Sequence, residues 1–252
     1  MGRQDLRGKN ALITGAGRRI GHAIAMALGE EGANVVIHYL HTEKEASELS
    51  AELNHIGAKS WLVKADFEDA VECGTLIERS LEMAGSLDIL INNASIFPAD
   101  SLRDLDFVDL MKNMQVNAWA PFLLSRDFAT QVGRGQIVNL LDTRIEGYDW
   151  KHVSYILSKH VLSVLTKMTA LEFAPQIRVN GIAPGLILPP AGKDDSFLDR
   201  MANSVPLKRH GGPSDVADAV IYLLKSDFLT GEVIRVDGGR HLMEYGGGPH
   251  TD

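Results

Sequence analysis

Short runs of aliphatic and β-branched residues alternate with longer amphipathic segments along most of the chain. The runs cover residues 10–14, 34–39, 60–63, 87–91, 136–140, 178–182 and 232–236. The segments with helical periodicity cover 21–30, 43–56, 70–84, 105–132, 152–173 and 213–225. Strands separated by helices form a parallel sheet with helices on both faces. We therefore expect one α/β domain over residues 1–252, a Rossmann fold with a doubly wound, seven-stranded parallel sheet. Its ligand should lie beyond the carboxyl ends of the strands.

Composition narrows the class of protein. The formal net charge is −8, and an acidic surface repels phosphate backbones, so we expect no nucleic-acid partner. The first apolar run is too short for a membrane span or a secretion signal, which predicts a cytoplasmic protein without membrane contact. Cys73 is the only cysteine, and His38 and His41 have no evident third ligand. We therefore expect neither a disulfide nor a metal site.

A glycine-rich turn follows the first strand. Residues 14–21 read Thr-Gly-Ala-Gly-Arg-Arg-Ile-Gly and lead directly into a helical segment. Glycines permit a tight turn, and the N-terminus of a helix favours the negative charge of a pyrophosphate. The spacing differs from G-x-G-x-x-G, but the position after the first strand predicts a dinucleotide site that includes Gly15, Ile20 and Gly21.

The end of the second strand indicates which dinucleotide is bound. Residues 35–42 read Val-Val-Ile-His-Tyr-Leu-His-Thr, without the acidic residue that usually holds the ribose hydroxyls of NAD. Arg18, His41 and Thr42 would instead offer positive charge and hydrogen-bond donors to a 2′-phosphate. We therefore expect NADPH as the cofactor. The alternative is that Arg18 and His41 only occupy a solvated surface.

Polar residues also follow the third and fourth strands. Asp66 could accept a hydrogen bond from the adenine amino group, and residues 92–95 read Asn-Asn-Ala-Ser. Either segment could be only a polar turn, because Asn, Asp and Ser are common in turns. Their placement at successive strand ends favours contact with the cofactor.

Tyr155 and Lys159 are four residues apart, so a helix places them on one face. A nearby ammonium stabilises a phenolate and helps a tyrosine to exchange protons near neutral pH. The pair predicts proton transfer beside a bound ligand.

Taken together, these motifs resemble the short-chain dehydrogenase/reductase family over nearly the whole chain. Further matching segments are Asn117, residues 179–185 and residues 236–239. The resemblance implies that Tyr155 transfers a proton, that Lys159 binds the nicotinamide ribose and tunes Tyr155, and that Asn117 supports a proton-relay water. The further cofactor contacts that it implies are Arg19, His38, Phe67, Asn93, Ala94, Ser95, Pro184, Gly185, Leu186 and Ile187.

Two departures from that family pattern carry more information than the agreement. Arg19 stands where most members have glycine or alanine, and Asp142 stands in place of the usual catalytic serine. A serine hydroxyl donates a hydrogen bond to a carbonyl or alcohol oxygen, whereas an ionised aspartate only accepts. Ordinary ketone chemistry is therefore less expected.

Both departures resemble the pteridine reductase branch, which includes dihydromonapterin reductases. There, the aromatic residue that matches Phe97 stacks the pterin against the nicotinamide. The predicted substrate contacts are Arg19, Ser95, Phe97, Asp142 and Tyr155. Three of them have an alternative role: Phe97 could pack in the core, Arg19 could lie on a surface helix, and Asp142 could cap the segment after its strand.

The leading hypothesis is an NADPH-dependent pteridine reductase that reduces a C=N bond of a dihydropterin, dihydrofolate or oxidised pterin. Tyr155 and Asp142 would supply the proton, since Asp142 disfavours the phenolate by like-charge repulsion. One alternative is a general NADPH-dependent carbonyl reductase for a ketone, quinone or imine. Another is a nucleotide-sensing protein without useful catalysis.

The sequence also predicts the roles of two further segments and the oligomeric state of the protein. Residues 186–204 combine glycine, proline and charge after a strand end, which predicts a substrate lid, with a solvated surface loop as the alternative. Residues 244–252 are expected to be a flexible tail. Apolar stripes lie in residues 114–132 and 152–173; the resemblance implies that such helices form the interfaces of a homotetramer, or of a dimer. Arg240 and Tyr245 could approach a neighbouring subunit's site.

Overall fold

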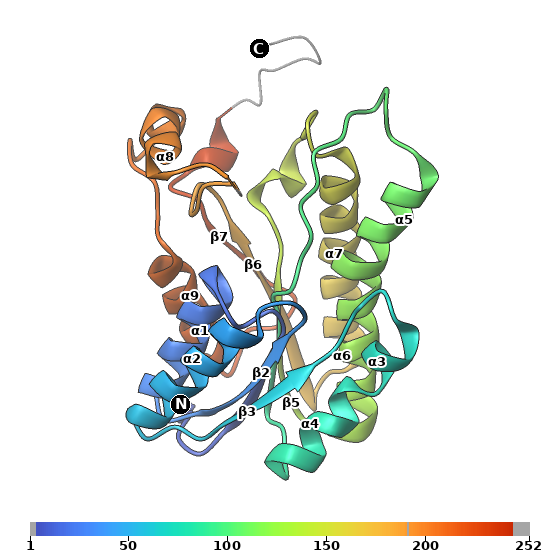
Figure 1. Ribbon diagram of the computed structural model, residues 1–252, viewed down its shortest axis with the longest axis vertical. Coiled ribbons are helices and arrows are strands. Elements are labelled where there is room, and N and C mark those ends of the chain that lie inside the picture. Colours follow the sequence, from blue (N-terminus) through green and yellow to red (C-terminus); the bar gives the residue numbers. More distant parts are fainter. Residues whose placement is uncertain (1–3, 191, 244–252) are drawn as a thin grey trace.

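The computed structural model describes residues 4–190 and 192–243 and contains a seven-stranded, all-parallel sheet (Figure 1). The strand order is β3-β2-β1-β4-β5-β6-β7, so the order reverses beside β1 and the predicted doubly wound Rossmann fold is confirmed. The strands are β1 (Asn10–Ile13), β2 (Asn34–Tyr39), β3 (Ser60–Lys64), β4 (Ile89–Asn92), β5 (Gly135–Leu140), β6 (Ile177–Pro184) and β7 (Val233–Val236).

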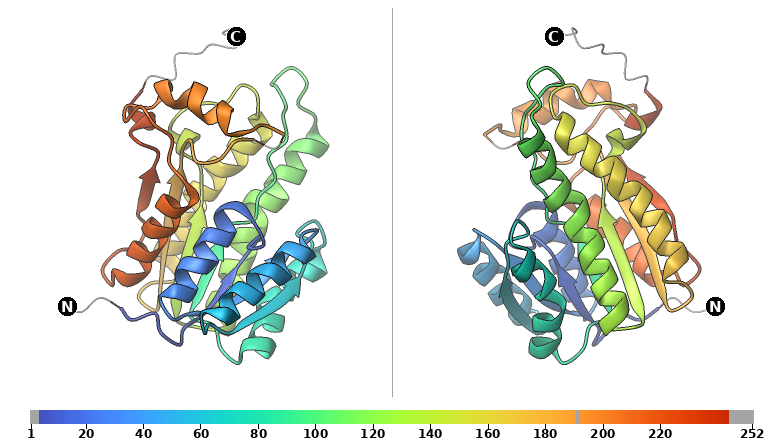
Figure 2. Two further views of the ribbon diagram at one scale, coloured as in Figure 1. Left: turned by 60° about the vertical axis from the view of Figure 1, so that its left-hand side comes forward. Right: turned by 90° about the vertical axis from the view of Figure 1, so that its right-hand side faces the viewer.

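Helices cover both faces of the sheet (Figures 1 and 2). One face carries α1 (Arg19–Glu30), α2 (Glu43–His55) and α9 (Pro213–Lys225); the other carries α3 (Ala70–Gly74), α4 (Leu76–Ala84), α5 (Phe107–Met114), α6 (Ala120–Gln131) and α7 (Val153–Glu172). Alternate strand residues enter opposite layers: Ile13 and Ile37 pack beneath α1 and α2, whereas Leu12 and Val36 face the other side. The alternation buries β1, β2 and β4 on both faces, as their continuous apolar sequences require.

The segment expected as one helix over residues 105–132 consists of three pieces. α5 leads into a π-helical turn, η1 (Gln115–Trp119), before α6 begins. Pro121 has no N–H to donate to the carbonyl of Asn117, four residues earlier, which disfavours a regular α-helix at this point. The structure thus places an irregular turn around a residue that the sequence predicts to be functional.

The carboxyl ends of the strands point toward one end of the molecule. There the chain after β6 forms α8 (Asp195–Met201) and η3 (Ala202–Ser204), and η4 (Arg240–Leu242) follows β7 (Figure 1). The expected lid of residues 186–204 therefore lies on the ligand side of the sheet, although its covering role stays a prediction. The expected tail, residues 244–252, lies outside the described residues, as does Tyr245. The described part of the chain has no helix with the length and apolar character that a membrane crossing needs.

Candidate active site

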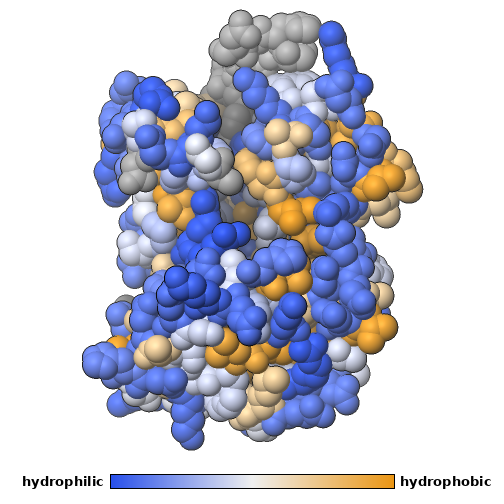
Figure 3. Space-filling model, viewed as in Figure 1, coloured by the Kyte–Doolittle hydropathy of each residue, from blue (hydrophilic) through white to orange (hydrophobic). Residues whose placement is uncertain are grey.

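A cavity of about 610 Å³ opens at the carboxyl ends of the strands. In the view of Figure 1, apolar side chains gather beside a hollow near the centre of the molecule, and further apolar patches lie in its lower part and at its right-hand edge (Figure 3). The cavity brings together every residue that the sequence predicts to contact cofactor or substrate. They are Gly15, Arg18, Arg19, Ile20, Gly21, His38, His41, Thr42, Asp66, Phe67, Asn93, Ala94, Ser95, Phe97, Asp142, Tyr155, Lys159, Pro184, Gly185, Leu186 and Ile187. Asn117 is fully buried behind this wall.

The glycine-rich turn is closely packed against the end of β4. A Cβ atom on Gly21 would lie 2.4 Å from the carbonyl oxygen of Gly15. Gly15 has φ +62°, and a Cβ there would lie 3.0 Å from the Cα of Ala94. The Asn93 side-chain amide donates to the carbonyls of Thr14 and Gly15, at 2.8 and 3.1 Å. Only glycine fits both positions, and the exposed backbone suits the close approach of a pyrophosphate.

His38 lines the cavity, but both of its ring nitrogens are engaged within the protein. The backbone N–H of Gly15 donates to Nδ1 at 3.0 Å, and Nε2 lies 3.0 Å from the carbonyl of Ala65. Nδ1 must then be unprotonated, while Nε2–H donates. Burial lowers the pKa of His38 to about 4, and the ring stacks on Phe67 at 4.6 Å. His38 is a neutral support for the glycine-rich turn.

The outer end of the cavity offers cations and a hydroxyl. Arg18, His41 and Thr42 line it, and the end of β2 carries no carboxylate. Glu68 also lines the cavity, but its carboxylate pairs with the ammonium of Lys112 at 2.8 Å. This donor set fits a phosphate better than a pair of ribose hydroxyls.

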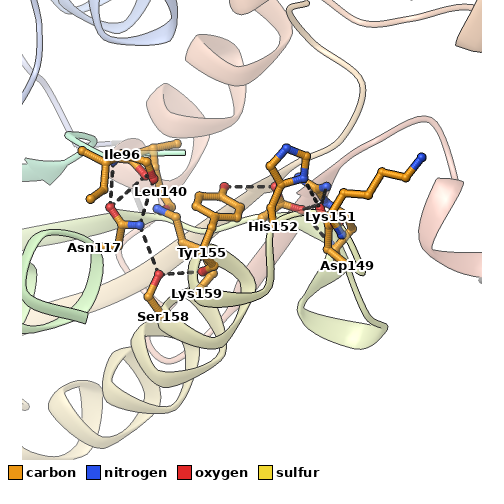
Figure 4. Close-up of polar contacts among 12 residues, drawn as sticks. Ile96, Asn117, Leu140, Asp149, Lys151, His152, Tyr155, Ser158 and Lys159 are labelled. Carbon is orange, nitrogen blue, oxygen red and sulfur yellow. Dashed lines mark hydrogen bonds and ion pairs between the residues drawn. The ribbon is translucent and has the colours of Figure 1, made fainter. Parts of the chain in front are cut away.

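Tyr155 and Lys159 lie one turn apart on α7, and both are buried. The Tyr155 hydroxyl donates to Oδ2 of Asp142 at 3.0 Å, and Lys159 Nζ donates to the Leu140 carbonyl at 2.7 Å (Figure 4). Burial and then the Asp142 charge raise the pKa of Tyr155 well above its ordinary value. Burial lowers the pKa of Lys159 to about 8. The tyrosine is thus held as a proton donor beside a cationic group.

Asp142 follows β5 and performs two structural tasks. Its Oδ1 accepts from the backbone N–H of Arg144 at 2.8 Å and so caps η2 (Thr143–Glu146). Its Oδ2 accepts from Tyr155. Burial opposes ionisation, but the charge and hydrogen bonds of Arg144 hold the pKa of Asp142 below its usual range. The cap expected as an alternative role therefore coexists with the contact to Tyr155.

Comparison with known proteins fits this geometry. A family model described as enoyl-(acyl carrier protein) reductase matches residues 15–241. The chain belongs to the short-chain dehydrogenase/reductase family. It is therefore an oxidoreductase. One curated relative, the 3-oxoacyl-[acyl-carrier-protein] reductase FabG of Staphylococcus aureus (strain N315), is 32% identical over 242 residues, which are 93% of this chain and 98% of the relative.

Two solved members of this short-chain dehydrogenase/reductase family are FolM alternative dihydrofolate reductases, each in complex with NADP. The Brucella canis protein has a TM-score of 0.88 and 32% identity, and the Brucella suis protein has a TM-score of 0.89 and 31% identity. Each match covers 95% of this chain and 97% of the other. The family resemblance and its pteridine-reductase-like character are confirmed by these matches.

Sequence reasoning missed Arg144, a largely buried guanidinium in the centre of this dehydrogenase/reductase site. It pairs with Asp142 through Nε and Nη2 at 3.0 and 2.9 Å, and Nη1 contacts the carboxylate of Asp149. Its Cζ lies over the Phe97 ring, 5.4 Å from the centroid. The only signal in the sequence was its place two residues after Asp142.

Phe97 is 38% exposed, so it is not a core residue. His152 stacks on it with ring centroids 3.9 Å apart, and the Tyr155 ring is perpendicular to it with centroids 4.6 Å apart. His152 Nδ1 is 2.9 Å from Asp149 Oδ2, which fixes the imidazole (Figure 4). His152 and Asp149 were also missed, although His152 contacts Phe97 directly and Asp149 holds His152.

Asn117 lies in the π-helical turn and does not line the cavity. Its Oδ1 accepts from Ser95 Oγ and from the backbone N–H of Ile96, at 3.1 and 2.9 Å, and its Nδ2 donates to Ser158 Oγ at 3.1 Å. Asn117 thereby joins the chain after β4 to α7. Its expected support of a relay water stays a prediction.

Arg19 has φ +60°, a left-handed conformation that non-glycine residues rarely adopt. Its Nη2 donates to the carbonyl of Pro189 at 2.9 Å. The guanidinium thus connects the glycine-rich turn to the segment after β6, from which Phe197 and Met201 also line the cavity.

Proposed function

We propose that this short-chain dehydrogenase/reductase is an NADPH-dependent pteridine reductase that reduces a C=N bond of a dihydropterin, dihydrofolate or oxidised pterin. The observation that carries the proposal is the hydrogen bond from Tyr155 to Asp142. An ionised carboxylate at this place accepts from the tyrosine and has no proton to offer a carbonyl oxygen. A site of this kind suits reduction of a ring C=N bond, where a single proton goes to nitrogen.

The proposed cofactor is NADPH, which supplies a hydride to the carbon of the C=N bond. Arg18, His41 and Thr42 would hold its 2′-phosphate, and Asp66 its adenine. Asp66 Oδ1 also accepts from the Glu68 backbone at 2.9 Å, which orients the carboxylate. The NADP complexes of the two Brucella proteins support this choice.

The remaining steps belong to the protein's own residues. Phe97, backed by His152, offers a flat surface on which an electron-poor ring can stack. Arg19 offers donors at the cavity rim, and Ser95 offers a hydroxyl. Tyr155 transfers its proton to the ring nitrogen, and Lys159 keeps a positive charge beside the resulting phenolate.

The curated FabG relatives favour a second candidate, reduction of a 3-oxoacyl thioester, since one is 32% identical over 242 residues. The FolM proteins, named as alternative dihydrofolate reductases, support the pterin or folate substrate at similar identity. Asp142 decides our preference, because ketone reduction in this family relies on a serine donor at that position. A panel of dihydrobiopterin, dihydromonapterin, dihydrofolate and an acetoacetyl thioester, each with NADPH and NADH, tests both. Thioester turnover without pterin or folate turnover would reject the first proposal.

We also propose a homotetramer or dimer. Five exposed apolar side chains follow one another on α7 at intervals of four, three, four and three residues, and no described residue covers them: Leu157, Val161, Val164, Met168 and Leu171. Such a stripe is the pattern by which helices pair.

A further inference from the structure

Arg144 lies in the wall of the cavity and shares one positive charge between the carboxylates of Asp142 and Asp149. Three of its nitrogens contact Asp142 and Asp149, and the side chain is largely buried. A buried carboxylate without such a partner would be costly to keep ionised. The Asp142–Arg144 contact is bidentate, which fixes both the charge and the direction of the carboxylate.

Asp142 has little capacity left for a ligand. Its Oδ1 accepts from the Arg144 backbone and from Nε, while its Oδ2 accepts from Nη2 and from the Tyr155 hydroxyl. All four hydrogen bonds arrive from donors, so the carboxylate carries no proton in this arrangement. The tyrosine hydroxyl carries the only proton of the pair, and this proton leaves the hydrogen bond to Asp142 when it is transferred to a substrate.

We propose that Arg144 is a positioning residue that keeps Asp142 an ionised acceptor, so that Tyr155, and not Asp142, gives the proton to the substrate. The inference rests on the proposed reduction of a C=N bond. In that step the Tyr155 O–H bond breaks, an N–H bond forms, and the carbon receives the hydride. A proton from water later restores the phenol.

The negative charges of Asp142 and Asp149 near Tyr155 are balanced by the positive charges of Arg144 and Lys159. Burial raises the pKa of the phenol and the charges of Asp142 and Asp149 raise it further, whereas Arg144, whose Cζ lies 5.8 Å from the ring centroid, lowers it. Lys159 lies on the other flank, with Nζ 5.7 Å from the same centroid, and His152 contacts Asp149. Without Arg144, two carboxylates would face one ammonium, and the phenolate left by proton transfer would be strongly disfavoured.

Asp149 is the second anchor of the guanidinium. It accepts from Arg144 Nη1, from the Lys151 backbone and from His152, all within one loop. Burial opposes its ionisation, but His152 and Arg144 lower the pKa of Asp149 to about 2. The guanidinium is therefore held between two carboxylates, which fix its direction toward Asp142.

The test is the pH profile of kcat for pterin reduction in Arg144→Met, Arg144→Lys and the wild type. We expect Arg144→Met to lose about 10- to 100-fold in kcat at neutral pH. It should also gain an inflection between about pH 5 and 8, where Asp142 now takes up a proton. Arg144→Lys should restore the wild-type shape at reduced rate. A profile of Arg144→Met that superimposes on the wild type after scaling overturns the proposal.

Arg178→Met is the matched control, since Arg178 is also partly buried but donates to backbone carbonyls of α9 and the following loop, away from the cavity. It should lower Tm without altering the pH profile. If Arg144→Met does not fold, infrared difference titration of the wild type against Asp142→Asn decides the matter. Protonation of Asp142 between pH 5 and 8 in the wild type overturns the inference. Absence of pterin turnover in the wild type instead rejects the proposed function itself.

Discussion

The Tyr155 hydroxyl donates a hydrogen bond to Asp142 across 3.0 Å, although the two residues lie 13 positions apart and on different elements. Asp142 is fixed by η2 at the end of β5, and Tyr155 is fixed on the first turns of α7. Ketone reductases of this family present a hydrogen-bond donor at this position, whereas Asp142 is an acceptor. The direction of this one hydrogen bond therefore separates the two candidate substrate classes.

Changing Asp142 to serine should shift the substrate preference. We expect pterin turnover to fall about 100-fold or more, because the proton donor loses its positioning contact, while ketone or acetoacetyl thioester turnover rises relative to it. Steady-state kcat/KM on both substrates measures the ratio. Asp142→Ala, which supplies neither donor nor acceptor, is the control and should lose pterin turnover without the relative gain. Undiminished pterin turnover in both variants would contradict the role of Asp142.

Reductase activity should decline as the pH rises above about 8. Burial lowers the pKa of Lys159 to about 8, with Asp142 as an opposing influence that favours the ammonium. Raising the pH through that value removes the positive charge beside Tyr155. The residual activity of Asp142→Asn should begin to decline at lower pH, because this variant lacks the carboxylate that favours the Lys159 ammonium. Lys167→Met, an exposed lysine on the same helix, should leave the profile in place; a similar shift in that variant would argue against this assignment.

Folding stability should fall as the pH drops from about 6.5 to 4. His38 has a folded-state pKa of about 4, against 6.5 when unfolded. In that interval the unfolded chain binds more protons, so acid favours unfolding, by at most about 3 kcal/mol from this group. Denaturant titrations of the wild type and His38→Asn measure it. His38→Asn should be less stable at pH 7 but lose less on acidification, whereas His55→Asn, at an exposed site, should follow the wild type.

The α7 stripe should be a subunit interface. Light scattering coupled to size-exclusion chromatography is expected to report a dimer or tetramer for the wild type. The double change Val164→Lys and Met168→Lys should dissociate it, because each subunit would then bury two ammonium groups in the interface. Val71→Lys, which alters an exposed apolar residue on α3, should not. A wild-type monomer at all concentrations would refute the proposed assembly.

The fold could be predicted from the sequence because the short apolar runs of the strands and the helical periodicity of the segments between them are local properties of the chain. The glycine-rich turn, the Tyr155–Lys159 pair and Asp142 were equally visible, since each depends on residue type and spacing near a strand end. Gly15, Gly21, Asp142, Tyr155 and Lys159 all line the cavity described above.

Arg144, Asp149 and His152 could not be predicted in this way. Their contacts depend on how residues 142–152 bend back on themselves, and a surface loop with the same composition would place the charges in solvent. His38 is an opposite case. A histidine near a proposed phosphate site suggests a cation, but burial beside Phe67 lowers the pKa of His38 and keeps it neutral. Pairing and burial are tertiary properties, and they decided what these residues do.

The left-handed backbone of Arg19 lowers the stability of the fold at a residue that also lines the cavity. A side chain in this conformation costs about 1 kcal/mol relative to glycine, and most members of the family avoid that cost. Here the chain retains the strained residue, and its guanidinium reaches Pro189 across the cavity mouth. Arg19→Gly would therefore remove this strain and, at the same time, the contact that connects the glycine-rich turn to the segment that follows β6.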